Sequence, residues 1–193
     1  MKQIFIGLCL VFLALDCSSD QQSSANPEAD VRAAKSAIKE FAGALQMELK
    51  AAMKAGGPVA AIGVCNTQAM PITARVSADH GMILSRVSLK NRNPANVAND
   101  WQSAVLQDFE KKKLAGKDIS KLTWSETVKV GNGQEFRFMK AIPTAEVCLK
   151  CHGTQIAPEV SQVLASLYPE DRATGYKEGD IRGAFVVTRK LLN

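Results

Sequence analysis

The run Cys148-Leu149-Lys150-Cys151-His152 limits the possible roles of this chain more than any other feature of its sequence. With five cysteines and two histidines in 193 residues, this spacing would arise by chance in roughly one of seven hundred such chains. On a helix, at about 100° per residue, Cys151 lies roughly 60° to one side of Cys148 and His152 roughly 40° to the other. Both thiols and the imidazole then face one partner. The pattern is typical of c-type haem attachment, in which the cysteines bind the vinyl groups and the histidine binds the iron.

Two other kinds of site with this spacing fit the sequence less well. A thioredoxin-like redox pair needs a strand-helix-strand setting, which the residues around Cys148 do not show. A structural zinc site needs further ligands, and the rest of the mature chain offers only Cys65 and His80 besides. We therefore predict one covalently bound haem c. A zinc-bound or disulfide-bonded structural domain is the alternative.

The N-terminus has the pattern of an export signal. An apolar run from Ile4 to Leu15 is too short to span a bilayer but suits the core of a signal peptide. Cys17 follows closely and resembles the processed cysteine of a bacterial lipoprotein, although Asp16 stands where that pattern has Gly, Ala or Ser. We expect export to the periplasm and a membrane anchor through lipid on Cys17, with plain secretion as the alternative. The predicted divisions are a leader over residues 1–17, a flexible Ser- and Gln-rich tether over 18–27 and one domain over 28–193.

Charge and aromatic content narrow the possible partners. The formal net charge is +5, from 24 basic and 19 acidic side chains, and the basic residues form no stripe interleaved with aromatics. Binding to nucleic acid is therefore not expected. Aromatic residues make up only 6% of the chain. The core must then be largely aliphatic, or a large flat cofactor must supply part of its bulk.

The hydrophobic pattern predicts an α+β fold with a central antiparallel sheet. Apolar residues recur every three or four positions in a long helix that begins at Asn26-Pro27 and stops at Gly56-Gly57-Pro58. The turn Gly131-Asn132-Gly133-Gln134 predicts a hairpin between strands 124–130 and 135–142. Helices come first and no βαβ repeat follows. The other expected elements are a helix over 58–69, two short strands or a hairpin within 72–88, a loop over 91–99, a helix over 101–114, a helical turn over 148–152, a helix over 158–167, a loop over 168–180 and a strand over 183–191.

Residue chemistry alone leaves the second axial ligand of the iron open. Histidine or methionine is usual in electron carriers, which makes His80 and methionines such as Met53 candidates. His80 precedes Gly81 in a predicted turn, where an exposed histidine is the commoner outcome, and a helical methionine more often fills the core. Cys65 has small or apolar neighbours that would let a flat macrocycle approach, but free cysteine is also among the most buried residue types. An iron without a second ligand is the remaining possibility.

Several separate segments, in the same order, resemble one bacterial family. They are Ala61-Ile62-Gly63-Val64-Cys65, the segment from Arg86 to Asn96 with Trp101, the motif at 148–152, Tyr168-Pro169-Glu170-Asp171 through Gly175-Tyr176, and Gly179-Asp180-Ile181-Arg182-Gly183-Ala184. The family consists of single-haem c-type domains with a PAS-like fold, which occur alone or as the extracytoplasmic sensing part of signalling proteins. The resemblance implies a PAS-like α+β domain with a long N-terminal helix and flanking helices. It also implies axial ligation of the iron by His152 and Cys65.

The propionate groups of a haem need cationic or amide partners, and arginine supplies such contacts bidentately. A solvated position, or an ion pair with Asp100 or Asp180, is the alternative for each candidate. The candidates for propionate or pocket contacts are Arg86, Lys90, Arg92, Tyr176 and Arg182.

These expectations favour electron transfer or sensing over catalysis. A thiolate ligand from Cys65 favours ferric iron, lowers the reduction potential and occupies the position where oxygen or peroxide would bind. The expected role is electron transfer, or redox or gas sensing, with a separate redox or signalling protein as partner. The sequence does not indicate an oligomeric state. The alternative is a peroxidase-like haem enzyme with an open distal site.

Overall fold

The computed structural model describes residues 26–191. The predicted leader, Cys17 and nearly all of the tether lie outside the described residues. In chain order, the helices and strands are α1 (Pro27–Thr67), α2 (Ala69–His80), β1 (Ile83–Val87), α3 (Asp100–Leu114), β2 (Thr123–Val130), β3 (Gly133–Pro143), α4 (Leu149–His152), α5 (Pro158–Leu167) and β4 (Ile181–Leu191), with short 3₁₀ turns at 94–96, 119–121 and 146–148. Over the described range, no helix has the length and apolar character needed to cross a membrane.

The four strands form one antiparallel sheet in the order β1-β4-β3-β2. The β2–β3 hairpin turns at Gly131, where a φ of 59° suits the left-handed conformation that glycine adopts without strain. Strand β4 is last in the sequence but pairs with both β1 and β3, so it joins the two halves of the sheet. The predicted α+β fold, with a central antiparallel sheet and a long N-terminal helix, is confirmed.

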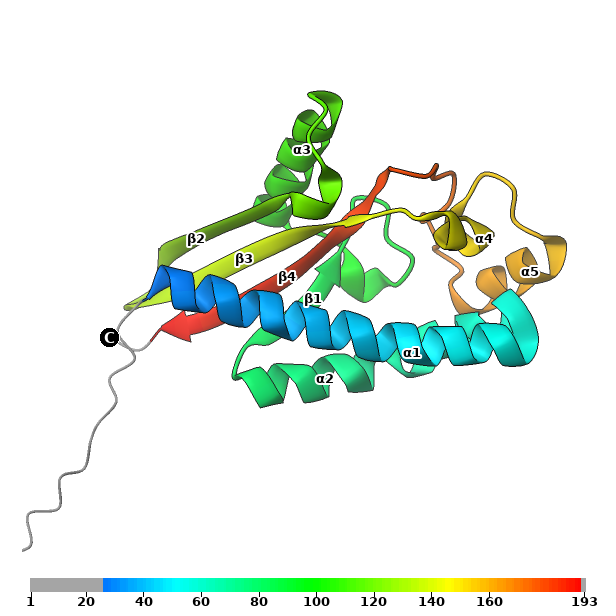
Figure 1. The fold of residues 1–193 in the computed structure, drawn as a ribbon, viewed down its shortest axis with the longest axis horizontal. Coiled ribbons are helices and arrows are strands. Elements are labelled where there is room, and N and C mark those ends of the chain that lie inside the picture. Colours follow the sequence, from blue (N-terminus) through cyan, green and yellow to red (C-terminus); the bar gives the residue numbers. More distant parts are fainter. Residues whose placement is uncertain (1–25, 192–193) are drawn as a thin grey trace, which may run out of the picture.

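Alternating side chains place an apolar cluster on each face of the sheet. On one face α1 and α2 cover the sheet, and on the other face α3 covers it (Figure 1). The first cluster contains Ala34, Ala37, Ile38, Phe41, Val76, Met82, Leu84, Phe136, Phe138, Val187 and Leu191. The second contains Val87, Val105, Leu106, Phe109, Leu122, Met139, Ala141, Ile181, Ala184 and Val186. Most of these side chains are aliphatic, as the low aromatic content predicted.

Helix α1 consists of two helical segments joined by a kink at the predicted stop signal. Asn26 caps its first turn by accepting a hydrogen bond from the Ala29 N–H at 3.1 Å. Gly56 and Gly57 have non-helical dihedral angles, and Pro58 begins the second segment. The predicted boundary is therefore confirmed, and the second segment ends at Thr67, two residues before the predicted end.

The expectation of strands throughout residues 72–88 is wrong for its first half. Residues Ala69–His80 form α2, which ends at Gly81 in the left-handed conformation, and only Ile83–Val87 form a strand. Helix α2 packs against α1, and Val76 on its inner face is fully buried. Burial of that face stabilises the helix more than the β-branched residues favour a strand.

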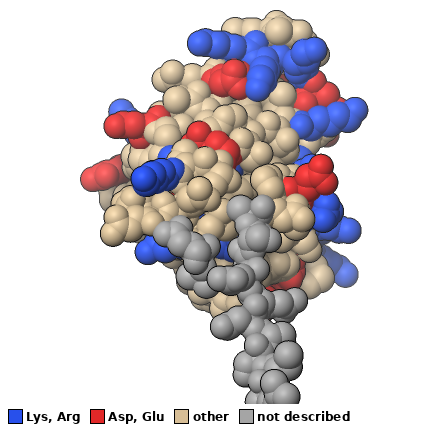
Figure 2. Space-filling model, turned by 90° about the vertical axis from the view of Figure 1, so that its left-hand side faces the viewer, with Lys and Arg blue, Asp and Glu red and all other residues tan. Residues whose placement is uncertain are grey.

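The beginning of α1 and the end of β4 lie at one end of the elongated molecule (Figure 1). Helices α4 and α5 lie at the opposite end, beside the second segment of α1. There Ile62 packs with Val160, Leu164 and Tyr168 in a third, smaller apolar cluster. Viewed from the end where α1 begins and β4 ends, acidic and basic side chains are interspersed over the surface (Figure 2).

Candidate functional site

The Cys-x-x-Cys-His run is helical, as its spacing requires. A 3₁₀ turn over Glu146–Cys148 leads directly into the single turn of α4, which carries Cys151 and His152. Cys148 and Cys151 are both half-buried and both are free thiols. The two sulfur atoms therefore lie on a short helical platform and are free to react.

A backbone hydrogen bond fixes the imidazole of His152. Its Nδ1 lies 2.7 Å from the carbonyl oxygen of Ala173, and its ring meets the Tyr176 ring edge-on at 6.4 Å between centroids. Burial lowers the pKa of His152 to about 3, and the charges of Arg182 and Arg92 act in the same direction. At neutral pH the ring is therefore uncharged. A carbonyl oxygen can only accept, so Nδ1 carries the proton and the lone pair of Nε2 is available for a metal.

Cys65 lines the same pocket as the motif. This pocket has a volume of about 150 Å³ and contains Cys65 from the end of α1 together with Cys148, Cys151 and His152. Cys65 is open to the pocket but is desolvated by the surrounding chain, and this burial raises the pKa of its thiol. The charges of three nearby arginines act in the opposite direction and favour the thiolate.

The kink in α1 gives this pocket its apolar walls. Leu49 and Met53 come from the helical segment before the kink, and Ala61 and Ile62 from the segment after it. Val147, which precedes the Cys-x-x-Cys-His run, and Tyr168, which follows α5, also line the pocket. Both segments of α1 therefore contribute to a mainly apolar pocket around the two candidate axial ligands.

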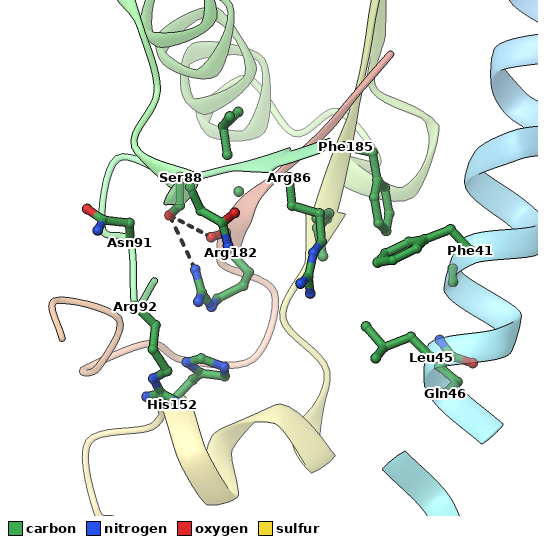
Figure 3. A pocket seen from close by; sticks show the side chains of 15 residues that line it. Phe41, Leu45, Gln46, Arg86, Ser88, Asn91, Arg92, His152, Arg182 and Phe185 are labelled. Carbon is green, nitrogen blue, oxygen red and sulfur yellow. Dashed lines mark hydrogen bonds between the residues drawn. The ribbon is translucent and has the colours of Figure 1, made fainter. Parts of the chain in front are cut away.

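Three arginines meet beside His152. Figure 3 shows Arg86, Arg92 and Arg182 pointing toward a neighbouring cavity of about 210 Å³ that His152 also lines. All three also line a smaller cavity with Cys65. Three adjoining cavities therefore share Arg92 and His152, with the thiols at one side and guanidinium groups at the other.

Two of these arginines have no carboxylate partner among the described residues. Arg86 lies over the Phe41 ring, 5.2 Å from its centroid, and Arg182 donates a hydrogen bond to Ser88 at 3.2 Å. The Nε of Arg182 is buried without a hydrogen-bond partner. Burial lowers the pKa of both guanidinium groups. An anionic group in this cavity would stabilise both charges.

Arg92 differs because it already has an acidic partner. Its Nε donates a hydrogen bond to Asp171 at 2.9 Å, and both side chains are only 11% exposed. The ion pair with Asp100 or Asp180 that was the sequence-based alternative is thus replaced by a pair with Asp171.

Lys90 and Tyr176 lie behind the imidazole rather than in the Cys65 pocket. The Lys90 ammonium lies 4.7 Å from the Tyr176 ring centroid and donates to the carbonyl oxygen of Thr174 at 2.6 Å. Both residues line a separate cavity with Ser88 and Glu110. Tyr176 contacts the site through the His152 ring, whereas the Lys90 side chain contacts Tyr176 and Thr174, and the Lys90 carbonyl oxygen accepts a hydrogen bond from Arg182 at 3.4 Å.

Of the other ligand candidates, His80 lies away from the site, whereas two methionines lie in it or beside it. His80 ends α2, and its Nε2 lies 3.0 Å from a carboxylate oxygen of Glu40, far from any cavity that contains the motif. Met53 lines the Cys65 pocket, and Met70 lines the smaller cavity beside Cys65. Across residues 26–191, no group of three or more His, Cys, Asp or Glu side chains is arranged to hold a metal ion by itself.

Sequence reasoning missed the two groups that hold His152 and Arg92 in place. The acceptor for His152 is the backbone of Ala173, which carries no side-chain signal. Asp171 was part of a recognised segment but was not given a role. Tyr168, which lines the Cys65 pocket, belongs to the same segment. The only sequence signal for this role was that Asp171 is an acidic residue in a segment that the resemblance had already singled out.

Fold and site together define an α+β domain with a Cys-x-x-Cys-His platform, a third cysteine and a group of arginines around adjoining cavities. The chain belongs to the Tll0287-like family, whose model matches residues 20–189. A solved structure, the crystal structure of the cyanobacterial heme-protein Tll0287, has the same fold with a TM-score of 0.59 and 23% sequence identity. The match covers 88% of this chain and 99% of that one. A comparison with curated proteins found no match.

Proposed function

We propose that this protein binds one haem c covalently through Cys148 and Cys151, with His152 and Cys65 as the axial ligands of its iron. The observation that carries this proposal is that all four side chains line one pocket while Nε2 of His152 is left free. The donor set is right for haem iron, since imidazole and thiolate are both haem ligands. Membership in a family named after a heme-protein supports the same cofactor. The PAS-like description of the fold is part of this proposal.

The distribution of charge also fits the cofactor. The thiols of Cys148 and Cys151 lie at one side of the adjoining cavities, and Arg86 and Arg182 at the other. A haem carries its vinyl and propionate groups on opposite edges, so Cys148 and Cys151 would hold its vinyl edge while Arg86 and Arg182 would pair with its propionates. Arg86 and Arg182 are therefore the proposed propionate partners, and the apolar walls from α1 exclude water from the macrocycle.

A bound haem supplies one-electron chemistry, with a potential that the axial ligands and burial set. The chain's own residues favour the oxidised state. His152 donates its Nδ1 proton to a carbonyl, which raises the basicity of the ring. Cys65, held as a thiolate on the iron, adds negative charge and occupies the sixth position. We infer a low-potential electron carrier or a redox sensor.

Gas sensing follows from the same arrangement. Release of Cys65 on reduction would open the sixth position to a small diatomic ligand. The non-helical kink at Gly56 and Gly57 separates the segment that carries Cys65 from the rest of α1, and it is the proposed hinge for such a release. Export to the periplasm and a lipid anchor on Cys17 remain part of the proposal, and the partner is a separate redox or signalling protein. A peroxidase-like enzyme is the second candidate, favoured only if the site is open at rest.

The decisive experiment compares the wild type with Cys65→Ala and Cys65→Ser after expression with the c-type cytochrome maturation system. A denaturing gel stained for haem should show covalent pigment in all three and none in Cys148→Ala/Cys151→Ala. Electron-resonance and optical spectra of the oxidised wild type should show low-spin iron with a thiolate ligand. Both Cys65 variants should lose that signature, whereas Met53→Leu, in the same pocket, should keep it.

Each part of the proposal has its own contradicting result. An unchanged low-spin signal in Cys65→Ala excludes thiolate ligation, and absence of covalent pigment in the wild type excludes haem attachment. Carbon monoxide should change the spectrum of the reduced wild type if Cys65 leaves, and no change counts against gas sensing. A five-coordinate resting spectrum with fast reaction with peroxide would favour the enzyme.

A further inference from the structure

Arg92 makes three hydrogen bonds that tie the haem motif to a distant loop. Its Nε donates to Asp171 at 2.9 Å. Its Nη2 donates to the carbonyl oxygen of Cys151 at 2.6 Å and to that of Ala173 at 3.3 Å. The guanidinium therefore contacts the backbone of the residue before His152 and the very oxygen to which His152 is bonded.

Asp171 holds the same residue, Ala173, at its N–H. One carboxylate oxygen accepts from Arg92, and the other accepts from the Ala173 N–H at 2.8 Å. The Ala173 residue is thus held at its N–H by Asp171 and at its carbonyl by Arg92 and His152. Two backbone hydrogen bonds of 2.9 Å, from Gly175 to the Gly153 carbonyl and from Tyr176 to that of His152, fasten the loop to α4.

We infer that the Arg92–Asp171 pair sets the orientation and the electron-donor strength of His152, and through them the reduction potential of the site. The two residues are positioning residues, because they act on His152 through the Ala173 peptide. The inference rests on the proposed function, since its effect is expressed at an iron bound by His152. It goes further by giving Arg92 and Asp171 a role other than propionate binding.

The sign of each contribution follows from charge. A carbonyl that accepts the Nδ1 proton makes the imidazole a stronger donor and stabilises ferric iron. Arg92 withdraws electron density from that carbonyl, and its positive charge also disfavours the ferric state. Asp171 neutralises Arg92. Both side chains are 11% exposed, so water screens these charges only weakly.

Arg92 differs from Arg86 and Arg182 in the partners that its guanidinium already has. Arg86 and Arg182 have no carboxylate partner in the described chain and remain available to an anion. Arg92 has its Nε and Nη2 already committed to Asp171 and to backbone carbonyls. Arg92 is therefore positioned to hold the loop that contains Asp171 and Ala173, and at most one of its guanidinium nitrogens can face the cavity.

The test measures reduction potentials by spectroscopic redox titration of the haem-loaded wild type, Asp171→Asn, Arg92→Gln and the double variant. Asp171→Asn should raise the potential, because it removes a negative charge and leaves Arg92 uncompensated. Arg92→Gln should lower it, and the double variant should return toward the wild-type value. Glu126→Gln is the matched control: it makes the same charge change in a pair with Arg137 on β2 and β3, and should leave the potential nearly unchanged.

A spectroscopic readout separates this role from a merely structural one. Arg92→Lys keeps the positive charge but loses the planar set of N–H donors, so it should alter the electron-resonance g values. Its reduction potential should stay nearer to that of the wild type than the potential of Arg92→Gln does. Single variants whose potentials shift in the same direction, or no further than Glu126→Gln, would overturn the inference. If the wild type carries haem, that result leaves the proposed function intact. Absence of covalent haem in the wild type would overturn both.

Discussion

Replacing Gly183 by alanine should be among the most damaging small substitutions in this protein. Gly183 lies in β4, where it pairs with Ile142 and comes close to the end of β1, with a φ of 155°. A Cβ atom built there would lie 2.2 Å from the carbonyl oxygen of Val87 and 3.2 Å from the Ser88 Cβ. The absence of a side chain lets β1 and β4 approach where they carry the two unpaired arginines into the cavity.

The size of the effect follows from these distances. An ordinary van der Waals contact begins at 3.4 Å, so β1 must move by more than 1 Å to accommodate the methyl group. Overpacking of this kind costs roughly 1–3 kcal/mol, and the unfavourable backbone angle adds about 1–2 kcal/mol. We expect Gly183→Ala to lower the free energy of unfolding by about 3 kcal/mol. Loss of the close approach should also disturb the Arg182–Ser88 contact.

Urea unfolding followed by far-ultraviolet circular dichroism gives the free energy from the midpoint and slope. Gly43→Ala is the matched control, because Gly43 is an exposed helical residue of α1 with no atom within 4 Å of an added Cβ. Its replacement should stabilise the protein by about 0.5–1 kcal/mol. The reasoning is refuted if Gly183→Ala falls within about 1 kcal/mol of the wild type, a span within which ordinary surface substitutions fall.

Three further predictions concern charge and the motif. Lys113 donates a 2.7 Å hydrogen bond to Asp180, which holds the pKa of that carboxyl below its usual range. The stability that Lys113→Met loses at pH 7 should therefore vanish as the pH falls below the ordinary aspartate value of about 4. Urea unfolding at a series of pH values measures this. Asp30 is buried and pairs with the partly exposed Arg189. Asp30→Asn should lower the free energy of unfolding by about 2 kcal/mol in the same assay. A loss no larger than that of a surface ion pair would contradict this. Gly153→Ala places a methyl group 2.6 Å from the carbonyl at the start of α4 and should reduce haem per polypeptide on a stained gel; an unchanged yield would count against the tight turn after the motif.

Features whose signals are local were predictable from the sequence. The cap at Asn26, the stop at Gly56-Gly57-Pro58 and the hairpin around Gly131 each depend on a few adjacent residues, and each is present. The haem motif is local too, and its helical geometry agrees with its spacing. Cys65 joined the site through a family resemblance, because nothing near it in the sequence shows that it lies opposite residues more than 80 positions later.

Helix α2 shows where local signals fail. Ile72, Thr73 and Val76 are β-branched and favoured a strand, yet Ile72 and Val76 are four residues apart and also fit one face of a helix. The Thr73 hydroxyl donates to the Ala69 carbonyl at 2.7 Å, within the helix. Packing of Val76 against the α1 side of the core decides between the two patterns, and that contact is invisible in a short window of sequence.

The support of His152 was beyond sequence reasoning for a different reason. Its partner is a main-chain carbonyl, which every residue possesses. The ion pair that holds this carbonyl joins residues 92 and 171, and only the fold brings them together. Backbone acceptors and long-range ion pairs carry no periodicity and no spacing rule.

The start of α1 and the Cys65 pocket lie toward opposite ends of the described molecule (Figure 1). At about 1.5 Å per residue, the 29 helical residues before the α1 kink extend roughly 44 Å. In a chain anchored at its N-terminus with α1 perpendicular to the bilayer, this helical segment would hold the Cys65 pocket away from the bilayer surface. If the protein is lipid-anchored and carries electrons as proposed, this separation favours a water-soluble redox partner over one embedded in the bilayer.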